Sequence, residues 1–219
     1  DISVLDNEFT RNRSTEKQPV IDLDGITNCL VQDNSLEENV RNRGMILNEC
    51  YYSSINNNYL RKNGGTAIDY YRSHHSDITD NIVEDHTGVH ANGITVYLYS
   101  DDIFIGGNIV LNGNVACTIQ ESTNLTIAYN VFHTDVAVYA VADWSNCDGV
   151  EYYNNVIRHT GTPGSGLSVG STSTNVVAKN NICDGSNVAY QGGVSEYNLY
   201  TSLSWTQDEG DLETGEIYH

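Results

Sequence analysis

An asparagine recurs at one position of a repeated phrase along the whole chain, and this repeat constrains the fold more than any other feature. The phrase takes forms such as "ITDNIV", "IGGNIV", "IAYNVF" and "YYNNVI". Its asparagines are separated by 27, 24, 23, 27, 22, 25, 26 and 17 residues. A period near two dozen residues with insertions of variable length is typical of a solenoid. The nine asparagines are Asn7, Asn34, Asn58, Asn81, Asn108, Asn130, Asn155, Asn181 and Asn198.

The phrase is short and rich in β-branched residues, so each coil is expected to consist of strands and turns rather than helices. An asparagine inside each turn can stack on the next one and donate its side-chain amide along the column, which satisfies backbone groups that would otherwise be buried unpaired. The sequence therefore predicts an all-β solenoid of about nine coils with an internal asparagine ladder. Residues 1–200 form this domain, and residues 201–219 depart from the repeat as a C-terminal extension or cap.

The chain has 219 residues and a formal net charge of -19. Phosphate recognition needs a basic surface, so nucleic acid is not an expected partner, and anionic membranes are disfavoured for the same reason. No apolar run approaches the roughly 20 residues of a membrane-spanning helix. Such acidity suits a saline or calcium-containing medium, in which cations screen self-repulsion, and a merely solvated acidic surface explains it equally well.

Five cysteines raise the question of disulfides. Cys50 and Cys147 share a phase in the repeat but stand about four coils apart, about 19 Å at a strand spacing of about 4.8 Å, which is beyond disulfide reach. Cys29 and Cys50 differ in phase, and no Cys/His zinc spacing occurs. The cysteines are therefore predicted to be core residues.

A second strand is predicted about a dozen residues before the asparagine, in segments such as 93–100, 115–122 and 137–144. Side chains alternate between the two faces of a strand. The inward residues are expected to be Ile94, Val96, Leu98, Cys117, Ile119, Val138, Ala140 and Ala142. The outward residues are then Asp69, Tyr71, Thr95, Tyr97, Tyr99, Thr118, Gln120, Tyr139 and Asp143.

On its nine-fold asparagine phrase, the chain resembles the right-handed parallel β-helix superfamily, the pectate-lyase-like solenoids, over nearly its whole length. The resemblance implies a right-handed parallel β-helix with a carbohydrate ligand along an exposed parallel sheet. Members of that superfamily are mostly polysaccharide lyases, glycoside hydrolases, epimerases and phage tailspikes, so the resemblance specifies no activity. The Tyr-Gly-x-Asp-Pro-His motif of alginate epimerases and the Gly-His-Gly series of polygalacturonases are absent, and only three lysines occur.

Coil length varies in the segments between the asparagine phrase and the next strand. Segments 84–93 and 158–166 are long, whereas 111–114 and 133–136 between them are short. Insertions in solenoids map to one face and commonly mark the binding side, so the long loops predict a trough about 14 Å long. Its floor carries groups that suit sugar faces and hydroxyls: Tyr97, Tyr99, Gln120, Tyr139 and Asp143. Its walls carry Asp85, His86, His90, Arg158 and His159.

The segment "EDHTGVHANG" concentrates candidates for acid–base chemistry. His86 or His90 could act as general base, with Asp85 orienting it or acting as acid. Glycosidases use two carboxyl groups that flank the scissile bond, and Asp143 with Asp85 or Asp69 could form such a pair. The alternative is a polar loop whose side chains cap their own turns.

Outside that segment, Arg158 and His159 could bind the carboxylate of an acidic sugar, and a simple surface role is the alternative. No metal site is assigned, because His86 and His90 lack an evident third ligand. No other cofactor is expected. Calcium at Asp101 and Asp102, or at Asp77 and Asp80, is the one exception left open.

These observations favour a secreted or virion-associated β-helix that binds a polysaccharide in the trough, with cleavage by lyase or hydrolase chemistry left open. The alternative is a non-catalytic structural fibre or adhesin in which the solenoid is a spacer. A fibre predicts uniform coils, and the unequal loops argue against it. Asp1 begins inside a repeat without a recognisable cap, so a homotrimer, as in a tailspike, and attachment to further coils are both left open.

Overall fold

The computed structural model describes residues 1–12, 18–88, 90–136, 139–161, 165–184, 187–189, 193–200 and 217–218. These residues form strands, bridges and turns. No helix long and apolar enough to cross a membrane occurs among them. The predicted extension 201–219 lies outside the described residues except for the short strand β27 (Ile217–Tyr218).

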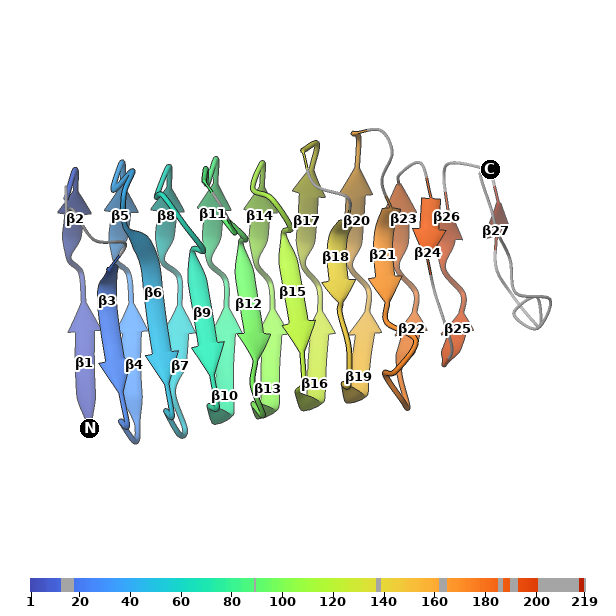
Figure 1. Ribbon diagram of the computed structural model, residues 1–219, viewed down its shortest axis with the longest axis horizontal. Helices are drawn as coiled ribbons and strands as arrows, with labels where there is room; N and C mark the ends of the chain where they lie inside the picture. The colour runs from blue at the N-terminus through green and yellow to red at the C-terminus, as the bar shows by residue number, and fades with distance from the viewer. Residues whose placement is uncertain are drawn as a thin grey trace.

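The chain winds into a parallel β-helix in which each coil adds one strand to each of three sheets (Figure 1). Sheet A has nine strands: β1 (Ile2–Leu5), β4 (Cys29–Gln32), β7 (Ser54–Asn56), β10 (His74–Thr79), β13 (Asp101–Gly106), β16 (Thr123–Ala128), β19 (Asp148–Tyr153), β22 (Val177–Lys179) and β25 (Val194–Glu196). Sheet B has ten: β2 (Glu8–Thr10), β5 (Ser35–Glu37), β8 (Tyr59–Arg61), β11 (Ile82–Glu84), β14 (Ile109–Leu111), β17 (Val131–Thr134), β20 (Val156–His159), β23 (Ile182–Asp184), β26 (Leu199–Tyr200) and β27. Sheet C has eight: β3 (Pro19–Asp24), β6 (Arg43–Asn48), β9 (Ile68–Tyr71), β12 (Ile94–Tyr97), β15 (Cys117–Gln120), β18 (Tyr139–Asp143), β21 (Ser165–Val169) and β24 (Asn187–Ala189).

The predicted fold class is confirmed, and the number of coils is close to the expected nine. The asparagine phrase, however, contains two strands rather than one. In "IGGNIV" strand β13 ends at Gly106 and β14 begins at Ile109, so Asn108 stands at the corner between sheets A and B. The residue before each ladder asparagine turns the chain with a positive φ, such as 55° at Asp80 and 69° at Gly107. Asp, Asn and Gly are common there because they tolerate this left-handed conformation.

The asparagine ladder forms as predicted. The backbone N–H and side-chain Nδ2 of Asn81 both donate to Oδ1 of Asn108, each at 3.0 Å. Nδ2 of Asn108 also donates to the carbonyl of Ile78 in the preceding coil at 2.8 Å. From Asn34 to Asn198 these asparagines are at most 2% exposed, so the ladder satisfies backbone groups that water does not reach.

A second polar column stands at the corner between sheets C and A. The backbone N–H of Cys50 donates to the hydroxyl of Ser73, that of Ser73 to the hydroxyl of Ser100, and that of Cys147 to the hydroxyl of Ser173. All five cysteines are free and buried, which confirms their prediction as core residues rather than disulfides.

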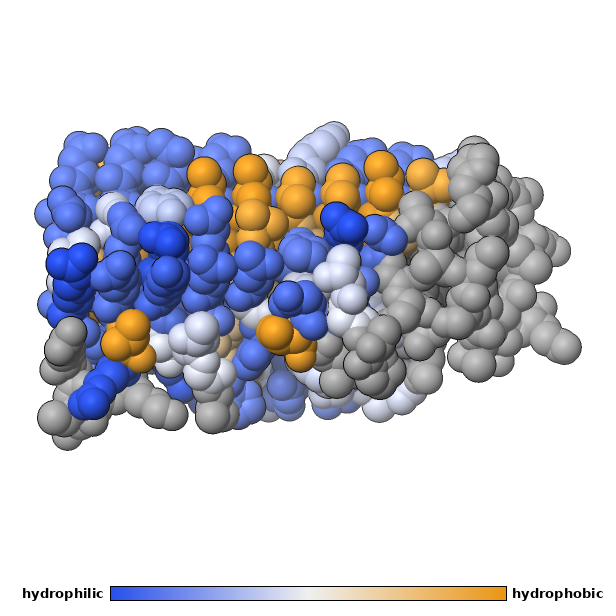
Figure 2. All heavy atoms as spheres, turned by 90° about the horizontal axis from the view of Figure 1, so that it is seen from above, coloured by the Kyte–Doolittle hydropathy of each residue, from blue (hydrophilic) through white to orange (hydrophobic). Residues whose placement is uncertain are grey.

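The inward rows of the three sheets fill the solenoid with aliphatic side chains, together with the fully buried Tyr70, Phe132 and Tyr152. The outward face of sheet B carries a second apolar row, visible in Figure 2 as a line of orange spheres along the long axis. Its five residues are paired strand to strand and are 36–42% exposed: Ile82, Ile109, Val131, Val156 and Ile182.

Candidate functional site

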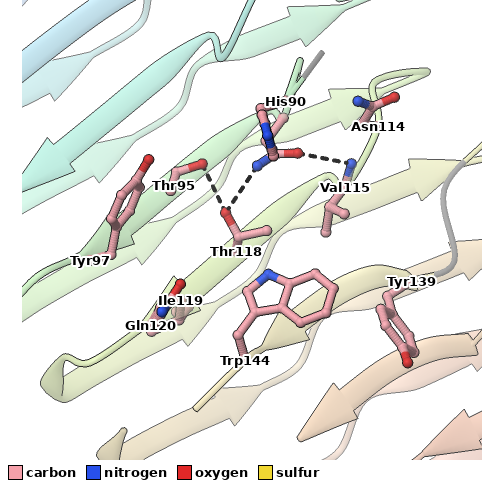
Figure 3. Close-up of a pocket in the computed structure, with 11 residues that line it drawn as sticks. His90, Thr95, Tyr97, Asn114, Val115, Thr118, Ile119, Gln120, Tyr139 and Trp144 are labelled. Atoms are coloured by element: carbon pink, nitrogen blue, oxygen red, sulfur yellow. Dashed lines mark hydrogen bonds between the residues drawn. The ribbon is translucent and has the colours of Figure 1, made fainter. Parts of the chain in front are cut away.

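A groove of about 550 Å³ opens on the outward face of sheet C, over β12, β15 and β18 (Figure 3). The loops that precede these strands supply one side of it, and the ends of the strands supply the other. We call this the groove. Its lining residues are His90, Asn92, Thr95, Tyr97, Asn114, Val115, Thr118, Ile119, Gln120, Tyr139 and Trp144.

The floor of the groove is a row of hydroxyl groups. Thr95 and Thr118 are paired on adjacent strands, and the Thr118 hydroxyl donates to the Thr95 hydroxyl at 2.8 Å. Nδ2 of Asn92 reaches the Thr118 oxygen at 3.5 Å, while its Oδ1 accepts from the Val115 backbone N–H at 3.4 Å. These bonds hold Asn92 against the floor and cross-link two successive coils.

Aromatic side chains form the ends of the groove. Trp144 follows β18 and is anchored by its backbone N–H, which donates to the Ile119 carbonyl at 2.8 Å. Its ring packs edge-on against Tyr139, with centroids 5.4 Å apart and an interplanar angle of 77°. Trp144 is 47% exposed, which leaves a large part of its ring open to solvent. Tyr97 stands at the opposite end of the groove, toward β9 (Figure 3).

Although the chain has a formal net charge of -19, the described lining residues of the groove include no Asp, Glu, Lys or Arg. His90, Tyr97 and Tyr139 are the titratable residues among them. Hydroxyl and amide groups beside open aromatic faces are suited to a polar, uncharged ligand surface with apolar C–H faces.

Four of the predicted site residues lie together in the groove: His90, Tyr97, Gln120 and Tyr139. Asp69 lies next to them, because β9 pairs with β12 and places Asp69 beside Thr95. It is fully buried, and Nη1 of Arg43 contacts its Oδ2 at 3.3 Å. Burial raises the pKa of Asp69 to about 7, and Arg43 opposes that rise.

Asp143 does not face the groove, contrary to expectation. Strand pairing aligns Val141 with Cys117 and Asp143 with Ile119, which are inward residues, so the predicted alternation of β18 is one residue out of phase. Ala140 and Ala142 accordingly occupy outward positions. The Asp143 carboxylate is 1% exposed and accepts a hydrogen bond from Ser173 at 2.5 Å, and burial raises its pKa.

His86 is also away from the groove. It is 3% exposed, and its Nδ1 donates to the Gly65 carbonyl at 3.0 Å, while burial lowers the pKa of the ring. It stands five residues after Asn81, the offset at which Asn39 follows Asn34 and Asn63 follows Asn58. Asn39 and Asn63 form a short second ladder, with Nδ2 of Asn39 donating to Oδ1 of Asn63 at 2.9 Å. His86 therefore continues a structural column.

The remaining predicted residues lie on other surfaces. Asp85 is partly exposed at the end of β11, where Nδ2 of Asn112 donates to it at 3.2 Å. Tyr99 follows the end of β12 and borders a separate depression with Glu121, Thr123 and Asn146. Arg158, on sheet B, pairs with Asp184 at 3.0 Å, and the adjacent His159 is 2% exposed. The predicted wall at 158–166 does not border the groove among its described residues.

Seven lining residues were not among the predicted site residues: Asn92, Thr95, Asn114, Val115, Thr118, Ile119 and Trp144. The outward positions of Thr95 and Thr118 followed from alternation, so their place in the floor was available from the sequence. Trp144 had a weaker signal, a large ring directly after a strand of small residues.

Three of the four acidic residues considered for calcium are engaged in side-chain hydrogen bonds or an ion pair. Asp101 accepts from Thr123 and Asn124, Asp102 contacts Nδ1 of His75 at 2.7 Å, and Asp77 accepts from a serine of the preceding coil. Within the described parts of the chain, no three His, Cys, Asp or Glu residues gather as metal ligands. Calcium binding stays a prediction.

A family model described as "Periplasmic copper-binding protein (NosD)" matches residues 1–146. The chain belongs to the NosD family. No curated protein matches the chain. Among solved structures, the A-module of mannuronan C-5 epimerase AlgE6 from Azotobacter vinelandii is similar, with a TM-score of 0.73 and 15% identity over 88% of this chain and 58% of that one. The ORF18 protein of Geobacillus virus E2 has a TM-score of 0.62 and 10% identity over 86% and 42%. The chain thus spans about half of each of these proteins, and at such identities they show the fold alone.

The copper in the family's description does not fit the residues described here. The five thiols are at most 3% exposed and are distributed among separate coils of the core. Copper sites combine several imidazole, thiolate or thioether ligands around one point, and no such group of three His, Cys, Asp or Glu residues occurs in the described residues.

Proposed function

We propose that the groove binds a short stretch of polysaccharide, lying along the helix axis across β12, β15 and β18. The observation that carries the proposal is the combination of an open Trp144 ring with an uncharged floor of hydroxyl and amide groups in one groove. Aromatic rings pack on the C–H faces of sugars, while hydroxyls and amides exchange hydrogen bonds with their oxygens. A mannuronan epimerase with the same fold gives this ligand class added support.

The proposal is binding without cleavage. A glycosidase needs two carboxyl groups on either side of the scissile bond. Asp69 occupies an outward position on β9 but is fully buried, and Asp143 lies on the inward row of β18, so the two do not flank a common space in the groove. We further propose that the protein acts outside the cytoplasm, in a periplasmic, secreted or virion-associated setting, where polysaccharides are met; the family description and the viral protein of similar fold agree with this.

The test is isothermal titration of the protein with hexasaccharides of different chemistry: cellohexaose, xylohexaose, mannuronan hexamer and hexagalacturonate. At least one is expected to bind, and Trp144→Ala is expected to weaken that binding about tenfold or more, because the ring supplies most of the apolar contact. Tyr129→Asn is the matched control. Tyr129 is an equally open aromatic, 67% exposed, but lies at the corner between sheets A and B, where other coils carry asparagine.

Binding that is unchanged in Trp144→Ala, or equally lost in Tyr129→Asn, would contradict the proposal. If none of the four probes binds and no other glycan of a wider panel does, the structural fibre becomes the better account of the chain.

A further inference from the structure

Two tyrosines and an ion pair form a connected group at the end of the groove toward β6. Tyr71 and Tyr97 are paired on adjacent strands, with ring centroids 4.3 Å apart and hydroxyl oxygens 2.7 Å apart. Nη1 of Arg43 lies 3.4 Å from the Tyr71 hydroxyl and 3.3 Å from Oδ2 of Asp69. Of these four residues, only Tyr97 lines the groove.

The chemistry of the donors gives this chain of hydrogen bonds a direction. A guanidinium group only donates, so Arg43 supplies a hydrogen to the Tyr71 oxygen. Tyr71 in turn donates its own hydrogen to the Tyr97 oxygen. Tyr97 therefore accepts from Tyr71, and its hydroxyl hydrogen is left to donate toward the groove. Successive hydrogen bonds polarise one another, and the cation at the start of the chain strengthens the donor at its end.

The ion pair between Arg43 and Asp69, at the start of this series of hydrogen bonds, is not required by the repeat of the solenoid. Asp69 occupies an outward row that continues through Ile46, Thr95, Thr118 and Ala142, and the other carboxylate of this row, Asp22, is exposed rather than buried. A fully buried carboxylate is costly, and Oδ1 of Asp69 has no hydrogen-bond partner. Its Oδ2 holds the guanidinium of Arg43, which is 36% exposed and would otherwise be free to extend into solvent. Burying the Asp69 carboxylate thus costs free energy, and the buried carboxylate holds the Arg43 guanidinium in place.

We propose that Tyr71, held by Arg43, positions the Tyr97 hydroxyl as a hydrogen-bond donor to an acceptor oxygen of the saccharide in the groove. This inference rests on the proposed function and deepens it. Tyr71 and Arg43 are positioning residues, because they act through Tyr97. The end of the groove therefore selects sugars that present an acceptor oxygen to Tyr97 and discriminates against analogues that lack it, since the donor would then be left buried and unpaired.

The binding test compares Tyr71→Phe, Tyr97→Phe and the double variant, with the best of the four hexasaccharides as probe. Each single variant is expected to lower affinity about tenfold, and the double variant no further, because both remove the same hydrogen bond. Arg43→Lys is expected to retain most of the affinity, since it keeps a cationic donor, whereas Arg43→Met loses it. Tyr99→Phe is the control, because Tyr99 lies outside the groove.

The second measurement needs no ligand. Burial and the neighbouring Asp69 carboxylate raise the pKa of Tyr97 well above its ordinary value. In protein labelled with 13C at tyrosine Cζ, Tyr71→Phe is expected to shift the Tyr97 resonance and to make Tyr97 ionise at higher pH, because the donor that stabilises its phenolate is lost. A merely structural role of Tyr71 would leave both unchanged in a variant that stays folded.

The outcomes separate this inference from the proposed function. If Tyr97→Phe weakens binding but Tyr71→Phe does not, the positioning role is wrong and the groove remains a binding site. If Trp144→Ala and Tyr97→Phe both bind as the wild type does, the proposed function fails. Should no probe bind, an unchanged Tyr97 resonance in Tyr71→Phe would still overturn the hydrogen-bond chain, and a shifted one would support it. If Tyr71→Phe does not fold, the Arg43 pair of variants answers the same question.

Discussion

The outward faces of sheets B and C are built on the same coils but carry opposite kinds of sequence. On sheet B, five successive coils present one aliphatic residue each at the same register position, 36–42% exposed. On sheet C, the corresponding row changes from Asp69 to Thr95, Thr118 and Ala142, and all four are at most 4% exposed. The outward row of sheet B is thus repetitive, aliphatic and partly exposed, whereas the outward row of sheet C varies from coil to coil, is mostly polar and is buried.

The difference arises from the connections between strands. Two residues, Gly107 and Asn108, join β13 to β14 at the corner between sheets A and B, so the ladder leaves no room for variation there. The connection from β11 to β12 runs from 85 to 93 and carries His90 and Asn92 to the groove. Repeated residues therefore mark positions that every coil requires for its fold. Residues that depart from the repeat are concentrated in the longer connections, where a site can form.

The largest effect is expected where repetition is strictest, at Asn108→Ala. The substitution removes the Oδ1 that accepts from both the backbone N–H and the Nδ2 of Asn81, and the Nδ2 that donates to the Ile78 carbonyl. Each buried group left without a partner costs roughly 1–3 kcal/mol, so the free energy of unfolding should fall by about 5 kcal/mol. Urea denaturation followed by circular dichroism measures the change.

Asn112→Gly is the control for Asn108→Ala, because Asn112 has a φ of 57°, which glycine adopts without strain. Asn112 donates to Asp85 at the surface, and the loss of this bond should change stability by less than about 0.5 kcal/mol. A similar loss in the free energy of unfolding in the two variants would mean that the ladder hydrogen bonds stabilise the fold no more than a surface hydrogen bond does.

The next largest effect tests the opposite face, at Asp69→Asn. If the role of Asp69 is to hold Arg43 near the groove rather than to stabilise the coil, replacing its carboxylate with an amide should stabilise the protein. Its pKa is about 7 in the folded chain against 3.8 for the unfolded group, so the folded state holds a proton that the unfolded state has lost between these values. Wild-type stability therefore falls as the pH rises from about 4 to about 7, by on the order of 4 kcal/mol at this one site.

Asp69→Asn should accordingly be more stable than wild type at pH 8 and nearly equal to it at pH 4. Urea denaturation at a series of pH values measures the difference between the two proteins, which removes the contribution of the other acidic groups. A difference that is constant with pH, or a variant less stable at pH 8, would show that Asp69 with Arg43 supports the coil.

The sequence was sufficient for the parts of the molecule governed by repetition. The period identified the solenoid, and alternation along β12 and β15 identified Tyr97 and Gln120, because in those strands apolar and polar residues truly alternate. Alternation failed in β18, where Ala140, Val141 and Ala142 are all apolar and either face could be inward. That ambiguity placed Asp143 on the wrong face. His86 was misjudged for another reason: a dense cluster of polar residues drew attention away from the five-residue offset that it shares with Asn39 and Asn63.

The pairing of Arg43 with Asp69 and Tyr71 had no sequence signal at all. Arg43 is 26 residues before Asp69, and the two meet only because β6 and β9 are neighbours in sheet C. Which side chains bend across a strand is decided by packing against the adjacent coil, and no local pattern contains that information.

The smallest effect is expected on the open face of sheet B, at Val131→Thr. Val131 is 36% exposed on the aliphatic row, and threonine has the same shape and a similar preference for strands, so stability should change by less than about 0.5 kcal/mol. Phe132→Ala is the contrast one residue along, where a fully buried ring is lost at a cost of about 3–5 kcal/mol. Sedimentation velocity on Val131→Thr adds a second measurement. An unchanged sedimentation coefficient is expected if the row faces water, whereas dissociation of an oligomer would show that the row is an interface, and the open face would then have a function of its own.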